Sequence, residues 1–92
     1  MASFPTYSYL HVTTATGLSV KTQNGLPQPC ILGGVSVNKT VVAAITLKDG
    51  NTTIGVLAAT TPAGMYFKVP MAVGNLNVSM AASTEDITIA YQ

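Results

Sequence analysis

Charged side chains are scarce in this 92-residue sequence. Only 8% of its residues are Asp, Glu, Lys or Arg, against about 25% in an ordinary soluble domain, and it contains no arginine. Four lysines and three acids leave a net charge of +1. Nucleic acids and anionic membranes are bound by clustered Lys and Arg. The composition therefore predicts neither a nucleic-acid nor a membrane partner.

The shortage of charge does not indicate disorder, because disordered chains combine low hydrophobicity with high net charge. Here 48% of the residues are hydrophobic, and Ser, Thr, Asn and Ala stand where a free monomer would carry Lys and Glu. Such a surface suits a protein that packs against copies of itself or against a larger lattice. The length allows one domain, spanning residues 1–92.

Residues for chemistry are equally few. The single cysteine, Cys30, excludes an internal disulfide. A thiol dyad of Cys30 with His11, the single histidine, is not expected, because no catalytic signature surrounds either residue. No metal or other cofactor is expected, and no enzymatic activity. The first basic residue is Lys21, so the N-terminus lacks the pattern of a signal peptide, and we expect a protein made in a cytoplasm.

Apolar residues alternate with polar ones at a period of two, which is typical of half-buried strands. Turn residues such as Asn24-Gly25, Pro62-Ala63-Gly64 and Gly74-Asn75 separate these runs. Gly33-Gly34, inside one run, indicates a bulge or a close backbone approach. The segment from Gln23 to Pro29 is expected to cross between sheets, with Pro27 and Pro29 outside the ladder. The pattern predicts an all-β antiparallel sandwich of jelly-roll type with about eight short strands, at 7–13, 18–22, 30–38, 41–48, 54–60, 65–70, 76–80 and 86–91.

The acidic residues are interpreted as structural. Asp49-Gly50-Asn51 resembles the start of a calcium loop, but the sixth position from Asp49 is Ile54 and the twelfth is Thr60, so the required glycine and glutamate are missing. Asp-Gly between two apolar strands predicts a hairpin instead. Glu85 and Asp86 are adjacent in a strand, so their side chains should point to opposite faces and not converge. We expect a solvated start to that strand, which would discourage edge pairing.

Aromatic residues gather near the N-terminus, before any charged residue. Tyr7, Tyr9 and His11 share one face of the first predicted strand, and amphipathic aromatics suit surfaces that become buried on association. Residues 1–10 form a possible docking arm. The interface residues expected here are Phe4, Pro5, Tyr7, Tyr9 and His11.

From Cys30 onward the order of features is familiar. Five segments follow one another here: "CILGGVSVN", "AAITLKDGNTTIGVLAAT", "GMYFKVP", "AVGNLNVSMAAS" and "EDITIAYQ". In this order of segments, over residues 30–92, the chain resembles small virion structural proteins of tailed bacteriophages. Leu32-Gly33 stands where that pattern often has Leu-His, and Gln92 where it often has Arg. The resemblance implies a β-sandwich subunit of the virion, such as a capsid decoration (cement) protein.

The expected function is therefore that of a non-enzymatic virion protein that decorates and stabilises the phage head. It would lie on the capsid exterior as a homotrimer, in contact with copies of itself and with the major capsid protein. Repeated modest interfaces in a lattice support such binding because avidity multiplies weak affinity. The alternative is a carbohydrate- or receptor-binding module, or a tail component, of a phage particle. Exposed aromatic platforms beside acids and amides would favour that alternative.

Overall fold

The structure of the chain is a computed structural model that describes residues 7–14, 17–81 and 84–92. Every regular element in these ranges is a strand, which confirms the predicted all-β class. The strands are β1 (Ser8–Val12), β2 (Leu18–Ser19), β3 (Thr22–Gln23), β4 (Leu26–Pro27), β5 (Cys30–Val37), β6 (Ile45–Asp49), β7 (Thr52–Leu57), β8 (Tyr66–Val73), β9 (Leu76–Met80) and β10 (Ile87–Tyr91).

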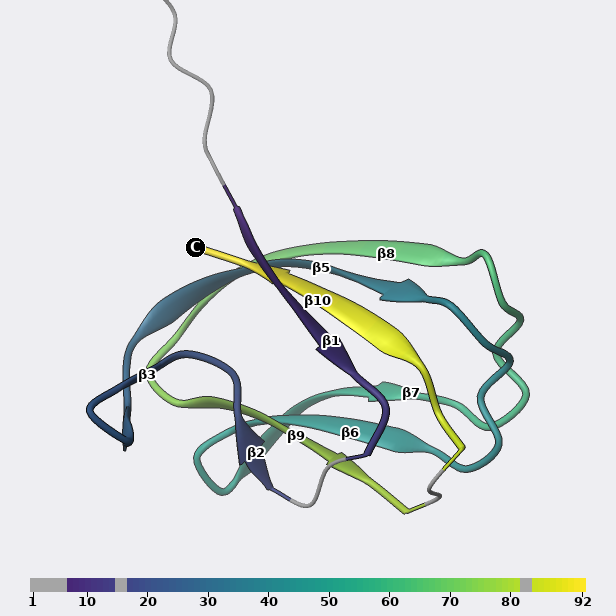
Figure 1. The fold of residues 1–92 in the computed structure, drawn as a ribbon, viewed down its shortest axis with the longest axis horizontal. Helices are drawn as coiled ribbons and strands as arrows, with labels where there is room; N and C mark the ends of the chain where they lie inside the picture. The colour runs from purple at the N-terminus through teal and green to yellow at the C-terminus, as the bar shows by residue number, and fades with distance from the viewer. Residues whose placement is uncertain (1–6, 15–16, 82–83) are drawn as a thin grey trace, which may run out of the picture.

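Eight of these strands form two antiparallel four-stranded sheets that pack face to face (Figure 1). Sheet A has the order β1-β10-β5-β8, and sheet B has the order β2-β9-β6-β7. The chain passes back and forth between the sheets, so that neighbours within a sheet are mostly distant in sequence. This is the connectivity of a jelly roll, as the sequence predicted. The remaining two strands, β3 and β4, form a separate hairpin between β2 and β5.

The core lies between the two sheets and is built almost entirely from aliphatic side chains. The predicted alternation holds in β9, where Leu76, Val78 and Met80 are buried, and in β10, where Ile87 and Ile89 are fully buried. Burial of this apolar face is the main stabilising contribution of such a sandwich. The largest fully buried side chains are Leu32, Ile45, Leu76, Ile87, Ile89, Val35, Val37, Val41 and Val78.

The Gly33-Gly34 step is a bulge, as predicted. Against β10, Gly34 pairs with Ala90 and Leu32 with Tyr91, so Gly33 is the extra residue. The bulge reverses the side-chain alternation along β5. Ile31 has the same parity in the sequence as Val35 and Val37, but because of the bulge Ile31 is exposed and Leu32 is buried.

The strand expected at 41–48 begins only at Ile45. The preceding residues form a bend, because the backbone amides of Val42 and Ala43 donate hydrogen bonds to the two carboxylate oxygens of Glu85. Glu85 is 2% exposed, so its predicted solvated position was wrong. It also precedes β10, which lies inside sheet A between β1 and β5 and not at an edge.

The segment from Gln23 to Pro29 does connect sheet B to sheet A, but Pro27 lies within a ladder. Thr22 pairs with Pro27 in the β3–β4 hairpin. The two turn residues, Asn24 and Gly25, both have positive φ, as a type I′ hairpin turn requires. Pro70 also lies inside a strand, β8, which is at the edge of its sheet. Pro70 is tolerated there because it lies with Val69 between the residues of β8 that pair with Leu32 and Gly34 of β5.

The Asp49-Gly50-Asn51 segment is a hairpin turn between β6 and β7, as predicted. Asp49 pairs with Thr52, and Gly50 has a φ of 60°, a value that favours glycine. The Asp49 carboxylate accepts a hydrogen bond from the backbone amide of Asn75 at 3.0 Å. This carboxylate therefore ties the β6–β7 turn to the β8–β9 turn and does not form part of a calcium loop.

Candidate docking surface

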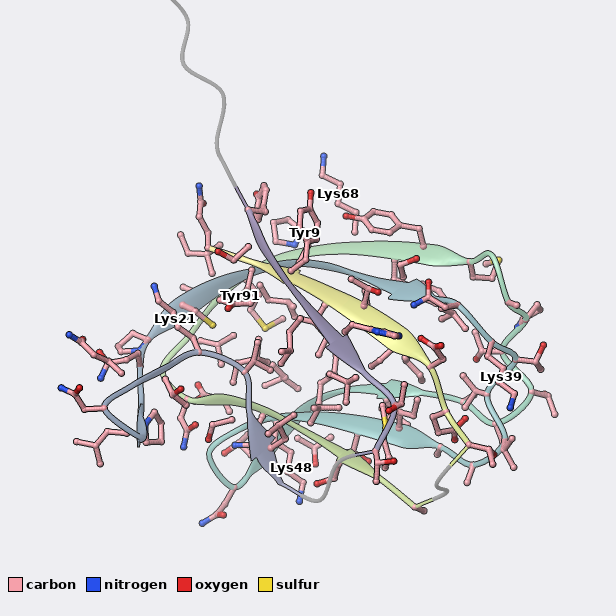
Figure 2. The ribbon with its side chains drawn as sticks, viewed as in Figure 1. Tyr9, Lys21, Lys39, Lys48, Lys68 and Tyr91 are labelled. Carbon is pink, nitrogen blue, oxygen red and sulfur yellow. The ribbon has the colours of Figure 1, made fainter. Side chains whose placement is uncertain are left out.

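The outer face of sheet A brings together residues from all four of its strands. Directly opposed residues in antiparallel strands share a face. One row across the sheet contains Tyr9, Ala90, Gly34 and Lys68, and the adjacent row contains His11, Thr88, Ser36 and Tyr66. Figure 2 shows Tyr9 and Lys68 on the side of sheet A that points away from sheet B.

Two tyrosines lie close against the glycines of β5. A Cβ placed on Gly33 would come 2.5 Å from the Tyr7 ring, and one placed on Gly34 would come 2.5 Å from the Tyr66 hydroxyl. Contacts this short are sterically forbidden, so only glycine lets these side chains lie over β5. The Gly-Gly step thus serves two purposes, because it forms the bulge and also makes room for two aromatic side chains.

The result is a shallow aromatic surface on sheet A. Tyr9 is 71% exposed and Tyr66 is 58% exposed, while Tyr7 is half-buried. A hollow of about 90 Å³ lies among these side chains. We call this surface the tyrosine face and define it by the residues around the hollow, Tyr7, Tyr9, Gly33, Tyr66, Lys68 and Ala90.

A polar network adjoins the tyrosine face. The Asp86 carboxylate lies 2.5 Å from the Nε2 atom of His11 and accepts a hydrogen bond from the Asn38 side-chain amide at 3.0 Å. The same Asn38 amide donates to the Thr88 hydroxyl at 2.9 Å. The hydrogen bonds from Asn38 and His11 hold the pKa of Asp86 below its ordinary value. Among the described residues, the His11–Asp86 contact is the one that joins a basic and an acidic side chain.

The predicted interface residues divide into two groups. Tyr7, Tyr9 and His11 lie on the outer face of sheet A, as the period of β1 implied. Phe4 and Pro5 lie outside the described residues. The possible arm at residues 1–10 overlaps β1, which begins at Ser8 and pairs with β10.

Sequence reasoning missed Tyr66 and Lys68, which reach the same face from β8. Their strand was predicted, but its place in sheet A was not. The available signal was the pair of glycines in β5, because adjacent small residues inside a strand leave space that a large side chain on a neighbouring strand can fill.

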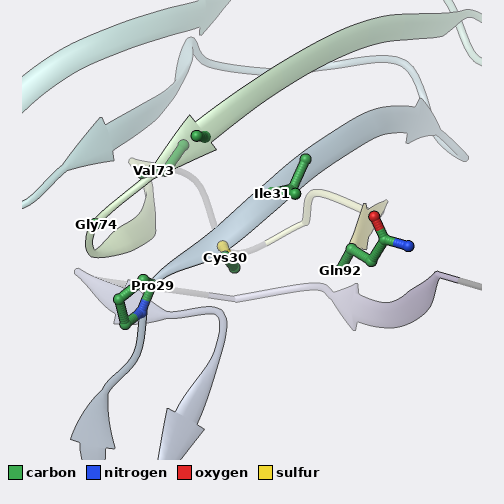
Figure 3. A pocket seen from close by; sticks show the side chains of 7 residues that line it. Pro29, Cys30, Ile31, Val73, Gly74 and Gln92 are labelled. Carbon is green, nitrogen blue, oxygen red and sulfur yellow. The ribbon is translucent and has the colours of Figure 1, made fainter. Parts of the chain in front are cut away.

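Another hollow, with a volume of about 480 Å³, lies where β5 begins and β8 ends (Figure 3). Cys30 lines it together with apolar neighbours that include Ile31 and Val73. Burial raises the pKa of the Cys30 thiol, which disfavours the reactive thiolate. Ser36 of β5 lies in the same cross-strand row as His11, and Cys30 is six positions away from Ser36 along β5. At about 3.3 Å per residue that separation is about 20 Å, which excludes a Cys30–His11 dyad.

The two adjacent acids serve separate structural roles. Glu85 binds the amides of Val42 and Ala43 inside the molecule, whereas Asp86 binds His11 and Asn38 on the outer surface. They do not converge, as predicted from their positions. Across residues 7–14, 17–81 and 84–92, no group of three His, Cys, Asp or Glu side chains is placed to hold a metal ion.

No helix long and apolar enough to cross a membrane is present in the described part of the chain. Comparison with protein-family models, with curated proteins and with solved structures finds no match for this chain. The resemblance of residues 30–92 to phage virion proteins thus stays a prediction from the residue pattern.

Proposed function

We propose that this protein is a non-enzymatic structural subunit of a phage virion that decorates the capsid exterior and docks through the tyrosine face. The observation that carries the proposal is the cluster of tyrosines supported by the glycines of β5 on a sheet face with few charges. The sequence pattern of residues 30–92 and the jelly-roll connectivity are compatible with it. Since one fold can host many functions, the surface carries more weight than the connectivity.

Several properties of the tyrosine face suit docking onto a protein shell. Tyrosine buries a large apolar area and keeps a hydroxyl for hydrogen bonding, which explains its enrichment in interfaces. Tyr7 and Tyr66 are held against β5, so fewer rotamers are lost on binding. Among the residues that define the face, Lys68 alone is charged. Little charge therefore has to be desolvated.

The proposed partners are copies of the same chain and the major capsid protein. A homotrimer is the assembly that a threefold lattice site would hold, and each copy would place one tyrosine face on the shell. Simultaneous binding by three copies would raise the overall affinity even if each face bound weakly.

The proposal is tested by co-sedimentation of the protein with phage heads assembled without it. The Tyr9→Ala/Tyr66→Ala double variant should lose most of its binding, because it removes the two most exposed rings of the face. The control is Leu26→Ala, which removes an equally exposed apolar side chain, 64% accessible, from the distant β3–β4 hairpin. Binding of the double variant equal to that of the control would overturn the docking surface.

A second measurement addresses the N-terminal segment. Removal of residues 1–6 leaves Tyr7 and β1 intact, whereas removal of residues 1–10 also removes part of a strand that pairs with β10. If the tyrosine face is sufficient, the shorter deletion should retain binding. If the segment also docks, binding should fall while the β-rich circular dichroism stays unchanged. Failure of the unmodified protein to bind heads at all would overturn the proposed function.

A further inference from the structure

A third hollow, of about 410 Å³, lies on the opposite side of the molecule from the tyrosine face and is lined mainly by polar atoms. It is on the outer face of sheet B, where β2, β6 and β9 meet the β6–β7 turn. Figure 2 shows Lys48 on this side and Tyr9 on the other. The polar side chains around the hollow are Ser19, Lys48, Asn51, Asn75, Asn77 and Ser79.

The wall of this hollow is held in place by the fold. The Asn77 side chain is almost fully buried, and its amide nitrogen donates hydrogen bonds to the backbone oxygens of Gly50 at 3.3 Å and Asn75 at 3.2 Å. The Ser79 hydroxyl accepts a hydrogen bond from the Gly17 amide at 3.0 Å. The polar groups are therefore positioned before any ligand arrives, which lowers the entropic cost of binding.

One charged group at the hollow has bonding capacity that the described chain does not use. Lys48 makes no salt bridge to an acid in the described part of the chain, and its ammonium group can donate to an anion.

We propose that this hollow binds an acidic carbohydrate, that is, a sugar unit with a carboxylate beside its hydroxyl groups. Lys48 binds the carboxylate, and the side-chain amides of Asn51 and Asn75 donate hydrogen bonds to the hydroxyls, while the amide hydrogens of Asn77 hold the wall of the hollow in place. The volume lies within the range of small-ligand sites, about 300–1,000 Å³. A fully ionised phosphate fits less well, because only one lysine lines the hollow to balance its two negative charges.

The site is independent of the tyrosine face, since it lies on the other sheet. A subunit docked through sheet A would leave this hollow open to the surroundings of the particle. Acidic-sugar binding therefore adds a second activity to the proposed docking role. Either one can fail without the other.

The experiment is a titration of the isotope-labelled full chain with methyl glucuronide and with a methyl sialoside, followed by NMR. We expect saturable shifts of the backbone amides of Lys48, Gly50, Asn51 and Asn77 with at least one of these acidic sugars. The uncharged methyl glucoside and sodium acetate, each of which supplies half of the proposed recognition, should bind at least about tenfold more weakly, equivalent to about 1.4 kcal/mol. Acetate binding as tight as the acidic sugar would show a simple anion site and overturn the proposal.

Variants locate the site. Lys48→Met keeps the aliphatic stem but removes the charge, and it should weaken binding of the acidic sugar at least about tenfold. Ser19→Phe should block the hollow sterically. Lys68→Ala, a matched loss of one lysine from the tyrosine face, should leave binding unchanged. The proposal is overturned if neither acidic sugar gives saturable shifts, if the shifts map to sheet A, or if Lys48→Met binds as well as the unmodified protein.

Discussion

The carboxylate of Glu85 accepts a hydrogen bond from the backbone amide of Val42 at 2.9 Å, across 43 positions of sequence. Its second oxygen accepts from the amide of Ala43 at 3.0 Å. One side chain thus satisfies two backbone donors in a bend that has no strand partner. The bend carries the chain from β5 in sheet A to β6 in sheet B, so this contact helps to hold the two sheets of the sandwich in register.

Replacement of Glu85 by alanine should lower the free energy of unfolding by about 2–3 kcal/mol, because two amides lose a charged acceptor. Glu85→Gln should cost less, since its carbonyl oxygen can still accept one of the two bonds. Urea denaturation gives both values. Asp86→Asn, a change to the neighbouring, partly exposed carboxylate, serves as the control and should cost less than Glu85→Ala. Equal losses in Glu85→Ala and Asp86→Asn would contradict a special role for Glu85.

The two glycines of β5 should respond differently to alanine. In Gly34→Ala the new Cβ would lie 2.8 Å from the backbone oxygen of Phe67, which cannot move without distorting β8, so a loss of about 1–3 kcal/mol is expected. In Gly33→Ala the nearest atoms belong to the Tyr7 ring, which can rotate away, so the stability loss should be smaller.

The glycine variants also separate stability from docking. Gly33→Ala should displace Tyr7, visible as changed ring signals of that residue in NMR spectra, and should weaken binding to phage heads. Gly55→Ala is the control, because its Cβ would meet only a Leu47 methyl carbon at 3.9 Å. A Gly34→Ala variant no less stable than Gly55→Ala would show that the tight contact with Phe67 is absent.

Acid should weaken the polar network beside the tyrosine face. The hydrogen bonds from Asn38 and His11 lower the pKa of Asp86 in the folded chain below its ordinary value of 3.8. A lowered folded pKa means that the stabilising contribution is fully present above the ordinary value and is lost as the pH falls through the folded pKa.

A carboxyl NMR titration of Asp86 measures this effect. In Asn38→Ala the pKa of Asp86 should rise toward its ordinary value, because the largest cause of the lowering is removed. Lys39→Ala removes a more distant charge with a smaller influence and should produce a smaller rise. An unchanged pKa in Asn38→Ala would mean that the Asn38 amide does not bind Asp86 in solution.

The thiol of Cys30 should be unreactive in the folded protein. It is buried, and burial raises its pKa, so modification by a disulfide reagent at neutral pH should be slower than in the unfolded chain by at least about tenfold. A Thr53→Cys thiol placed on the exposed part of β7 in a Cys30→Ala background should react quickly. Comparable rates for these two thiols would indicate that the end of sheet A opens readily.

Local sequence patterns determined much of this fold. The alternation in β9 and β10 identified inward-facing residues, Asp49-Gly50 identified the β6–β7 hairpin, and Gly33-Gly34 identified the bulge. Each of these features depends on backbone preferences or on side-chain direction within a few residues. Such preferences can be read without knowledge of the partner strand.

Tertiary structure alone decided which distant residues meet. It gave Glu85 a buried role and placed Tyr66 of β8 beside Tyr9 of β1, and beside Tyr7 just before β1, across two intervening strands. It also assembled the polar hollow around Lys48 from three strands. Local periodicity specifies the direction of a side chain but not the neighbouring strand in the sheet. The order of strands follows from burial of the whole aliphatic core, and that order determines both proposed binding surfaces.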